Sequence, residues 1–123
     1  MIAIVDDDEV MREALEALIE SMGHNAAVFA SAEEYLRSGL IRNTSCLISD
    51  MRMPGMSGLE LQQRLIAQGH RVPIIFLTGE HCDHIRASGL KAGAIAFLSK
   101  PAAPKALMAC VNDALKAPCW ALD

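Results

Sequence analysis

Aromatic residues are scarce in this 123-residue chain, which contains three Phe, one Tyr and one Trp. More than half of the residues are nonetheless apolar, which predicts one core built from Ile, Leu, Val, Ala and Met. No apolar run approaches the roughly 20 residues of a membrane-spanning helix. The first residues, MIAIVDDD, are too short and too acidic for a signal peptide. We therefore expect one soluble, cytoplasmic domain over residues 1–123 that does not contact a membrane.

Basic residues are also few, with 11 Lys and Arg against 15 Asp and Glu and no basic stripe. Binding a phosphate backbone over a broad surface needs clustered Lys and Arg, so we expect no direct nucleic-acid contact. No two cysteines have C-x-x-C spacing, which predicts free and mostly buried thiols at Cys46, Cys82, Cys110 and Cys119. Residues 81–84, His-Cys-Asp-His, offer too few nitrogen and sulfur ligands for a structural zinc site and are interpreted as a solvated loop that leads into a helix.

Short apolar runs alternate with longer amphipathic segments along the chain. The apolar runs predict strands over residues 2–5, 25–30, 46–49, 72–77 and 94–98. The amphipathic segments predict helices over residues 9–22, 31–39, 57–68, 83–91 and 103–116. Two of these helices are preceded by S-x-x-E capping boxes, at Ser31 and Ser57. Five βα units in succession predict an α/β fold, with a parallel sheet and helices on both of its faces.

Polar residues stand where these predicted strands end. In open parallel sheets, ligands bind beyond the carboxyl ends of the strands, so such residues gather at one rim. Taken singly, each of them is an ordinary strand-end or capping residue. Together they indicate a site, and they follow the first, third, fourth and fifth strands as Asp6, Asp7 and Asp8, then Asp50, then Thr78, then Lys100.

Three carboxylates at this rim, those of Asp6, Asp7 and Asp50, would repel one another without a cation. Hard oxygen ligands favour Mg²⁺ or Ca²⁺, and a sparse site of this kind suits Mg²⁺. A carboxylate beside such an ion can attack phosphorus and form an acyl phosphate. Asp50 is the best nucleophile because its strand is central. The Thr78 hydroxyl and the Lys100 ammonium would then stabilise the charge on the transferred oxygens.

Five segments carry a family resemblance: I-V-D-D-D-E at 4–9, S-D-M-R-M-P-G-M-S-G at 49–58, F-L-T-G at 76–79, K-A-G-A at 91–94 and F-L-S-K-P at 97–101. In this order they resemble the motifs of bacterial two-component response-regulator receiver domains. The residues of these motifs are most similar to those of FixJ-type receivers. The resemblance covers essentially the whole chain. It implies a doubly wound (βα)5 fold of the CheY and flavodoxin kind, with a five-stranded parallel sheet in the order 2-1-3-4-5.

The same resemblance implies that Asp50 accepts a phosphoryl group from a sensor histidine kinase or phosphotransfer protein. It implies Mg²⁺ as cofactor, bound by the side chains of Asp7 and Asp50, by Asp6 mainly through water, and by the backbone carbonyl of Arg52. A receiver is not an enzyme with a separate substrate, and at most catalyses its own phosphorylation from small donors and its own dephosphorylation.

The resemblance also implies which residues change conformation when the domain is phosphorylated. Thr78 turns towards the phosphoryl group, Phe97 swings inward as Thr78 moves, and Lys100 pairs with the phosphate, beside a cis Lys100–Pro101 bond. The surface that changes is formed by the fourth helix, fifth strand and fifth helix, and it would transmit the signal, in FixJ-type proteins to transcription. Residues 102–104, Ala-Ala-Pro, lack the aromatic that often follows this proline, which leaves the detail of that surface open.

Two alternatives remain at this point. Residues 6–10 also fit D-x-D-x-[TV], the motif of haloacid-dehalogenase-like phosphatases, with Asp6 as nucleophile. That reading leaves Asp50 and the Pro54–Gly55 turn unexplained, and no acidic pair follows Lys100. The second alternative is a receiver-shaped binding module that never takes phosphate. The cognate kinase, the output, dimerisation on phosphorylation and the length of the complete protein stay open.

Overall fold

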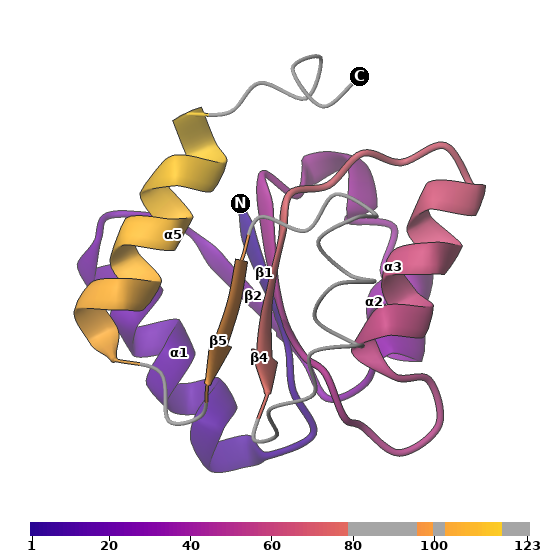
Figure 1. The fold of residues 1–123 in the computed structure, drawn as a ribbon, viewed down its shortest axis with the longest axis horizontal. Coiled ribbons are helices and arrows are strands. Elements are labelled where there is room, and N and C mark those ends of the chain that lie inside the picture. Colours follow the sequence, from indigo (N-terminus) through magenta and orange to yellow (C-terminus); the bar gives the residue numbers. More distant parts are fainter. Residues whose placement is uncertain (79–95, 100–102, 117–123) are drawn as a thin grey trace.

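A parallel five-stranded sheet forms the centre of the protein in the computed structural model, which describes residues 1–78, 96–99 and 103–116 (Figure 1). The strands lie in the order β2-β1-β3-β4-β5, as predicted. Their bounds are β1 (Ile2–Val5), β2 (Ala26–Phe29), β3 (Cys46–Asp50), β4 (Ile74–Thr78) and β5 (Ala96–Ser99). The helices are α1 (Glu9–Ser21), α2 (Ala32–Arg37), the 3-10 helix η1 (Ile41–Asn43), α3 (Gly58–Ala67) and α5 (Pro104–Lys116). The helix predicted over 83–91 lies outside the described residues.

Two apolar cores lie on opposite faces of this sheet. Figure 1 shows α1 and α5 over one face and α2 and α3 over the other. Successive residues of β1 alternate between them: Ile2 and Ile4 enter the α1/α5 core, and Ala3 and Val5 enter the α2/α3 core. Side chains alternate across a strand, so a sheet covered on both faces needs apolar residues at every position. Burial on both faces of the sheet therefore explains the continuous apolar runs in the sequence.

Side-chain caps fix where the helices start. The Ser31 hydroxyl accepts a hydrogen bond from the Glu34 N–H at 3.1 Å, and the Ser57 hydroxyl accepts one from the Glu60 N–H at 3.2 Å. Both predicted capping boxes are therefore confirmed at their serine side. A third cap is Asp8, whose carboxylate accepts from the N–H two residues further on at 3.0 Å. This cap places the start of α1 directly after the acidic end of β1.

Some predicted bounds differ from the structure, which also contains one short helix that was not predicted. Strand β4 begins at Ile74, two residues later than the apolar run indicated. Proline has no N–H to offer, but the carbonyl of Pro73 accepts from the Leu47 N–H at 2.8 Å, just before the regular pairing begins. The 3-10 helix η1 was not predicted, because three residues are too few to show a periodic pattern.

Cys46 and Cys110 are free thiols, as predicted, while Cys82 and Cys119 lie outside the described residues. Cys46 is fully buried in the α1/α5 core. Burial raises the pKa of its thiol from 9.0 to about 12, and the charge of Cys110 adds to the effect. Burial likewise raises the pKa of Cys110. Both thiols are therefore neutral at physiological pH and poor nucleophiles.

The raised Cys46 pKa makes folding stability depend on pH. The folded state holds the thiol proton more tightly than the unfolded chain, so this contribution is present below pH 9 and is lost as pH rises towards 12. We expect the free energy of unfolding to fall by about 1.4 kcal/mol per pH unit in this window. Urea denaturation at a series of alkaline pH values measures the slope. Cys46→Ala should make the slope smaller, and an unchanged slope in that variant would refute the assignment.

Candidate functional site

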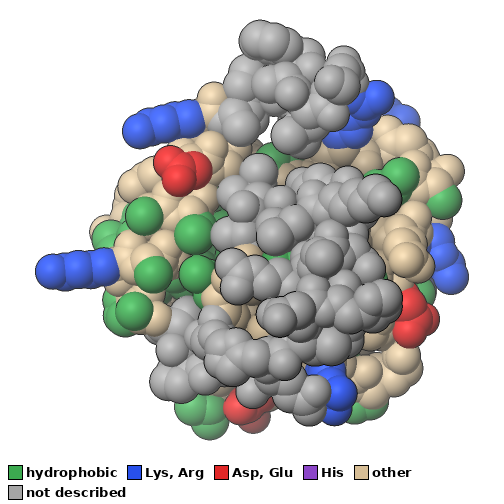
Figure 2. Space-filling model, viewed as in Figure 1, with side chains coloured by type: hydrophobic (Ala, Val, Ile, Leu, Met, Phe, Trp, Pro, Cys, Tyr) green, Lys and Arg blue, Asp and Glu red, His purple; other side chains and the backbone are tan. Residues whose placement is uncertain are grey.

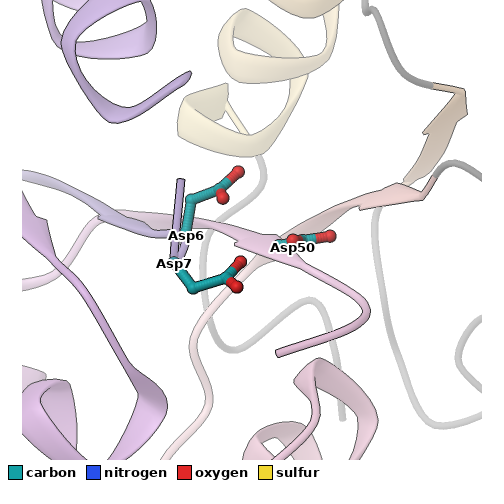
Figure 3. Close-up of side chains that lie close together, drawn as sticks. All are labelled: Asp6, Asp7 and Asp50. Carbon is teal, nitrogen blue, oxygen red and sulfur yellow. The ribbon is translucent and has the colours of Figure 1, made fainter. Parts of the chain in front are cut away.

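Three carboxylates meet at the carboxyl ends of β1 and β3 (Figure 3). One oxygen from each of Asp6, Asp7 and Asp50 lies within 4.8 Å of the others. The strand register explains this convergence, because Val5 pairs with Ser49 and the next residues of the two strands are Asp6 and Asp50. Asp7 follows on the same loop, and Figure 3 shows its carboxylate directed towards Asp50. The predicted convergence of these side chains is therefore observed.

The site combines buried and exposed acids. Asp6 is fully buried and Asp50 is 7% exposed, whereas Asp7 is exposed. Backbone donors partly compensate the buried charge: the Asp8 N–H donates to Oδ1 of Asp6 at 2.9 Å, and the Arg52 N–H donates to Oδ1 of Asp50 at 3.4 Å. Oxygen donors this close together can hold a divalent cation, and an all-carboxylate set fits a hard ion such as Mg²⁺.

Arg12 contributes to the site from α1, although the sequence analysis did not single it out. Its Nη1 donates to the backbone carbonyl of Asp6 at 2.8 Å, and its side chain is half-buried. This contact holds the end of β1 against the first turns of α1. The sequence does contain a pattern that could have indicated this contact, because an arginine four residues after a capping aspartate can reach back over the start of the helix. The same spacing, however, occurs on many solvated helices.

Gly58 is a second residue that the sequence analysis did not assign to the site. Its N–H donates to the Met51 carbonyl at 3.0 Å. A Cβ atom at this position would lie 2.5 Å from the carbonyl oxygen of Asp50 and 3.1 Å from the ring of Phe76. Glycine therefore allows α3 to begin directly behind the end of β3, and this close approach fixes the backbone of Asp50.

The other predicted site residues lie on neighbouring elements. Thr78 ends β4 and directly follows Leu77, the register partner of Asp50. Arg52 is exposed in the loop after β3. Lys100 and the predicted cis bond to Pro101 lie outside the described residues. The structure thus brings the three acids together and places Thr78 on the adjacent strand, while the roles of these residues stay predictions.

Phe97, the predicted switch aromatic, lies on β5 opposite Phe76 of β4. The two ring centroids are 4.9 Å apart with an interplanar angle of 36°. Phe97 is half-buried and packs against the α2/α3 core. Its ring is therefore linked through Phe76 to the helix start behind Asp50.

Comparison with known proteins adds independent evidence. A family model described as the response regulator receiver domain matches residues 2–112. This chain belongs to the response-regulator receiver family. Among its relatives, this receiver is 40% identical over 116 residues to the response regulator protein TmoT of Ectopseudomonas mendocina, covering 94% of this chain and 53% of TmoT. It is 38% identical over 112 residues to the transcriptional regulatory protein FixJ of Azorhizobium caulinodans, covering 91% of this chain and 53% of FixJ.

Solved structures agree with this assignment. The receiver matches the response regulator StyR with a TM-score of 0.88 and 39% identity, over 94% of this chain and 58% of StyR. It matches the FixJ-N structure with a TM-score of 0.84 and 29% identity, over 95% of this chain and 94% of FixJ-N. The receiver spans about half the length of the curated relatives it matches.

The family match favours the receiver over the phosphatase alternative with Asp6 as nucleophile. It confirms the predicted resemblance to two-component receivers, FixJ among them. None of the helices in the described part of the receiver combines the length and apolar character needed to cross a membrane.

Proposed function

We propose that Asp50 of this receiver accepts a phosphoryl group from a phosphohistidine of a sensor kinase or phosphotransfer protein. The observation that carries the proposal is the buried Asp50 carboxylate at the end of the central strand, within 4.8 Å of two further acids. A carboxylate oxygen of Asp50 forms the new bond to phosphorus as the P–N bond of the donor breaks. The histidine nitrogen leaves with the electron pair and takes up a proton.

The chain's own oxygens would hold Mg²⁺ for this step. Asp7 and Asp50 offer side-chain oxygens, Asp6 acts mainly through water, and Arg52 offers its backbone carbonyl. When bound, the ion neutralises the carboxylates and the developing charge on the phosphoryl oxygens. The backbone N–H of Arg52 already donates to Asp50, which supports the placement of this loop at the site.

Thr78, Phe97 and Lys100 are proposed to respond to the phosphoryl group. The Thr78 hydroxyl donates to one of its oxygens, Lys100 pairs with its charge, and Phe97 moves inward in the space that Thr78 leaves. The surface that changes would include β5 and α5. Figure 2 shows hydrophobic side chains gathered on the α5 side of the molecule. Exposed apolar residues of α5 and the position before it are Ala103, Pro104, Ala106 and Ala109.

The output is proposed to be transcription, because one relative is the transcriptional regulatory protein FixJ. In this proposal residues 1–123 form one cytoplasmic receiver domain that contacts proteins rather than nucleic acid or membrane. Dimerisation on phosphorylation is part of the proposal. The domain acts as a phosphoacceptor, with at most self-phosphorylation from small donors and self-dephosphorylation.

Intact-mass measurement after incubation with Mg²⁺ and a small phosphodonor tests the proposal. We expect the mass increase of one phosphoryl group, which should not form when a chelator removes divalent cations, because the three acids then repel the anionic donor. Adding excess Mg²⁺ back should restore uptake. An unmodified protein in the presence of Mg²⁺ would instead favour the alternative of a receiver-shaped module that acts by protein contact alone.

A further inference from the structure

Glu33 of α2 reaches across to the loop between β3 and α3. Its Oε1 accepts a hydrogen bond from the backbone N–H of Met56 at 3.2 Å. A Cβ atom at Gly55 would lie 3.0 Å from Oε2 of Glu33. Gly55 also has a φ of +79°, a conformation that glycine adopts without strain. The carboxylate therefore stands directly against the backbone of this turn, and the glycine leaves room for it.

The same loop carries the residues next to the phosphoacceptor. Its first half is fixed by the sheet and core, since the Met51 N–H donates to the Leu77 carbonyl at 2.8 Å and the side chains of Met51 and Met53 are buried. Arg52 lies between these two methionines, and its N–H contacts Asp50. The second half, from Pro54 to Met56, has exposed or half-buried residues. There the Glu33 contact joins the loop to α2.

We propose that Glu33 is a positioning residue for the phosphoacceptor site. By accepting the Met56 N–H, its carboxylate holds the β3–α3 loop so that the Arg52 N–H stays on Asp50 and the Arg52 carbonyl stays available to the proposed Mg²⁺. Glu33 does not touch the reacting atoms. This inference rests on the proposed function, in which Mg²⁺ binds Asp50 and the Arg52 carbonyl.

The neighbouring Glu34 provides a matched control. Both acids lie in the first turn of α2, so both interact similarly with the helix dipole. The Oε2 atom of Glu34, however, accepts from the N–H of Ala30 at 2.7 Å, at the start of its own helix. Glu33→Ala and Glu34→Ala therefore lose the same charge from the same turn, and only the first loses the contact with the loop.

Mg²⁺ titration followed by NMR, with amide hydrogen exchange in the metal-free protein, tests the proposal without any phosphodonor. We expect Glu33→Ala to weaken Mg²⁺ binding about fivefold, as the loss of one hydrogen bond would, and to speed exchange of the Met56 amide. Glu33→Gln keeps an oxygen acceptor and should restore both values. Glu34→Ala should leave both unchanged while lowering thermal stability.

Equal Mg²⁺ affinities in Glu33→Ala and Glu34→Ala would overturn the positioning role, as would failure of Glu33→Gln to restore binding. The proposed function fails separately, because it requires uptake of phosphate. A wild-type protein whose Mg²⁺ affinity depends on Glu33, but which takes no phosphoryl group from a small donor, would leave Glu33 as a positioning residue of a metal site and remove the phosphoacceptor role.

Discussion

Asp50→Asn should abolish phosphoryl uptake from a small donor in the presence of Mg²⁺. An amide oxygen is neutral and a poor nucleophile, and the substitution also removes one of the three negative charges from the acidic site. The measurement is intact mass after incubation with donor and Mg²⁺. Phosphorylation of the variant to the wild-type level would eliminate Asp50 as the acceptor.

Asp8→Asn is the matched control for this variant. It makes the same change in charge close to the site, but the Asp8 side chain caps α1 instead of facing Asp50. Asparagine caps helices about as well as aspartate, so stability and phosphoryl uptake should both stay close to the wild type. Loss of uptake in Asp8→Asn would mean that net charge, rather than the Asp50 nucleophile, governs the reaction.

Asp50→Asn should also change stability in opposite directions with and without metal. Without divalent cations, three carboxylates within 4.8 Å repel one another, so removing one charge should stabilise the fold by on the order of 1 kcal/mol. With Mg²⁺ the wild type gains the free energy of binding and the variant gains less. Thermal unfolding with and without Mg²⁺ measures both values. A variant less stable than the wild type in chelator would contradict this account.

Gly58→Ala should destabilise the protein and slow phosphoryl uptake together. Helix propensity alone favours alanine by up to about 1 kcal/mol. Here the added Cβ would meet the Asp50 carbonyl oxygen at 2.5 Å, and that atom belongs to the sheet backbone rather than to a flexible side chain. Overpacking of this kind costs about 1–3 kcal/mol, which exceeds the gain in helix propensity. The clash therefore makes the net effect on stability unfavourable. Relief of the clash requires α3 or the end of β3 to shift.

Urea denaturation and the initial rate of phosphorylation measure the two effects of Gly58→Ala. Gly69→Ala serves as control, because Gly69 has a φ of +81° and no atom within 4 Å of its would-be Cβ. That variant should cost about 1 kcal/mol through backbone strain and leave the rate unchanged. If Gly58→Ala proved as stable and as reactive as the wild type, the close packing of α3 against the end of β3 would not matter for function.

Much of this fold could be predicted because burial on both faces leaves a clear pattern. Ile2 and Ala3 are neighbours in sequence yet belong to different cores, so the run they start has no polar alternation and indicates a covered parallel strand. The start of β4 was misplaced for the same reason. Val72 packs against the α2/α3 core and is apolar like the strand, although pairing begins only at Ile74.

The acidic part of the site was predictable because parallel strands end at one edge, so Asp6 and Asp50 had to be neighbours once β1 and β3 paired. Gly58 and Glu33 were not predictable in this way. Their roles depend on how closely α3 approaches β3 and on where α2 lies beside the loop. Glu33 and Met56 are 23 positions apart, and no sequence pattern marks a contact that tertiary packing creates.

Asp50 ends the middle one of the five strands, with β1 and β4 bonded on either side. The carboxylate proposed as phosphoacceptor thus lies at the end of a strand whose backbone is paired on both sides. A charge added there has to be accommodated by the connecting loops and by side chains that can rotate. In the proposed function, such an arrangement would let the protein be modified and restored while the pairing of its strands stays the same.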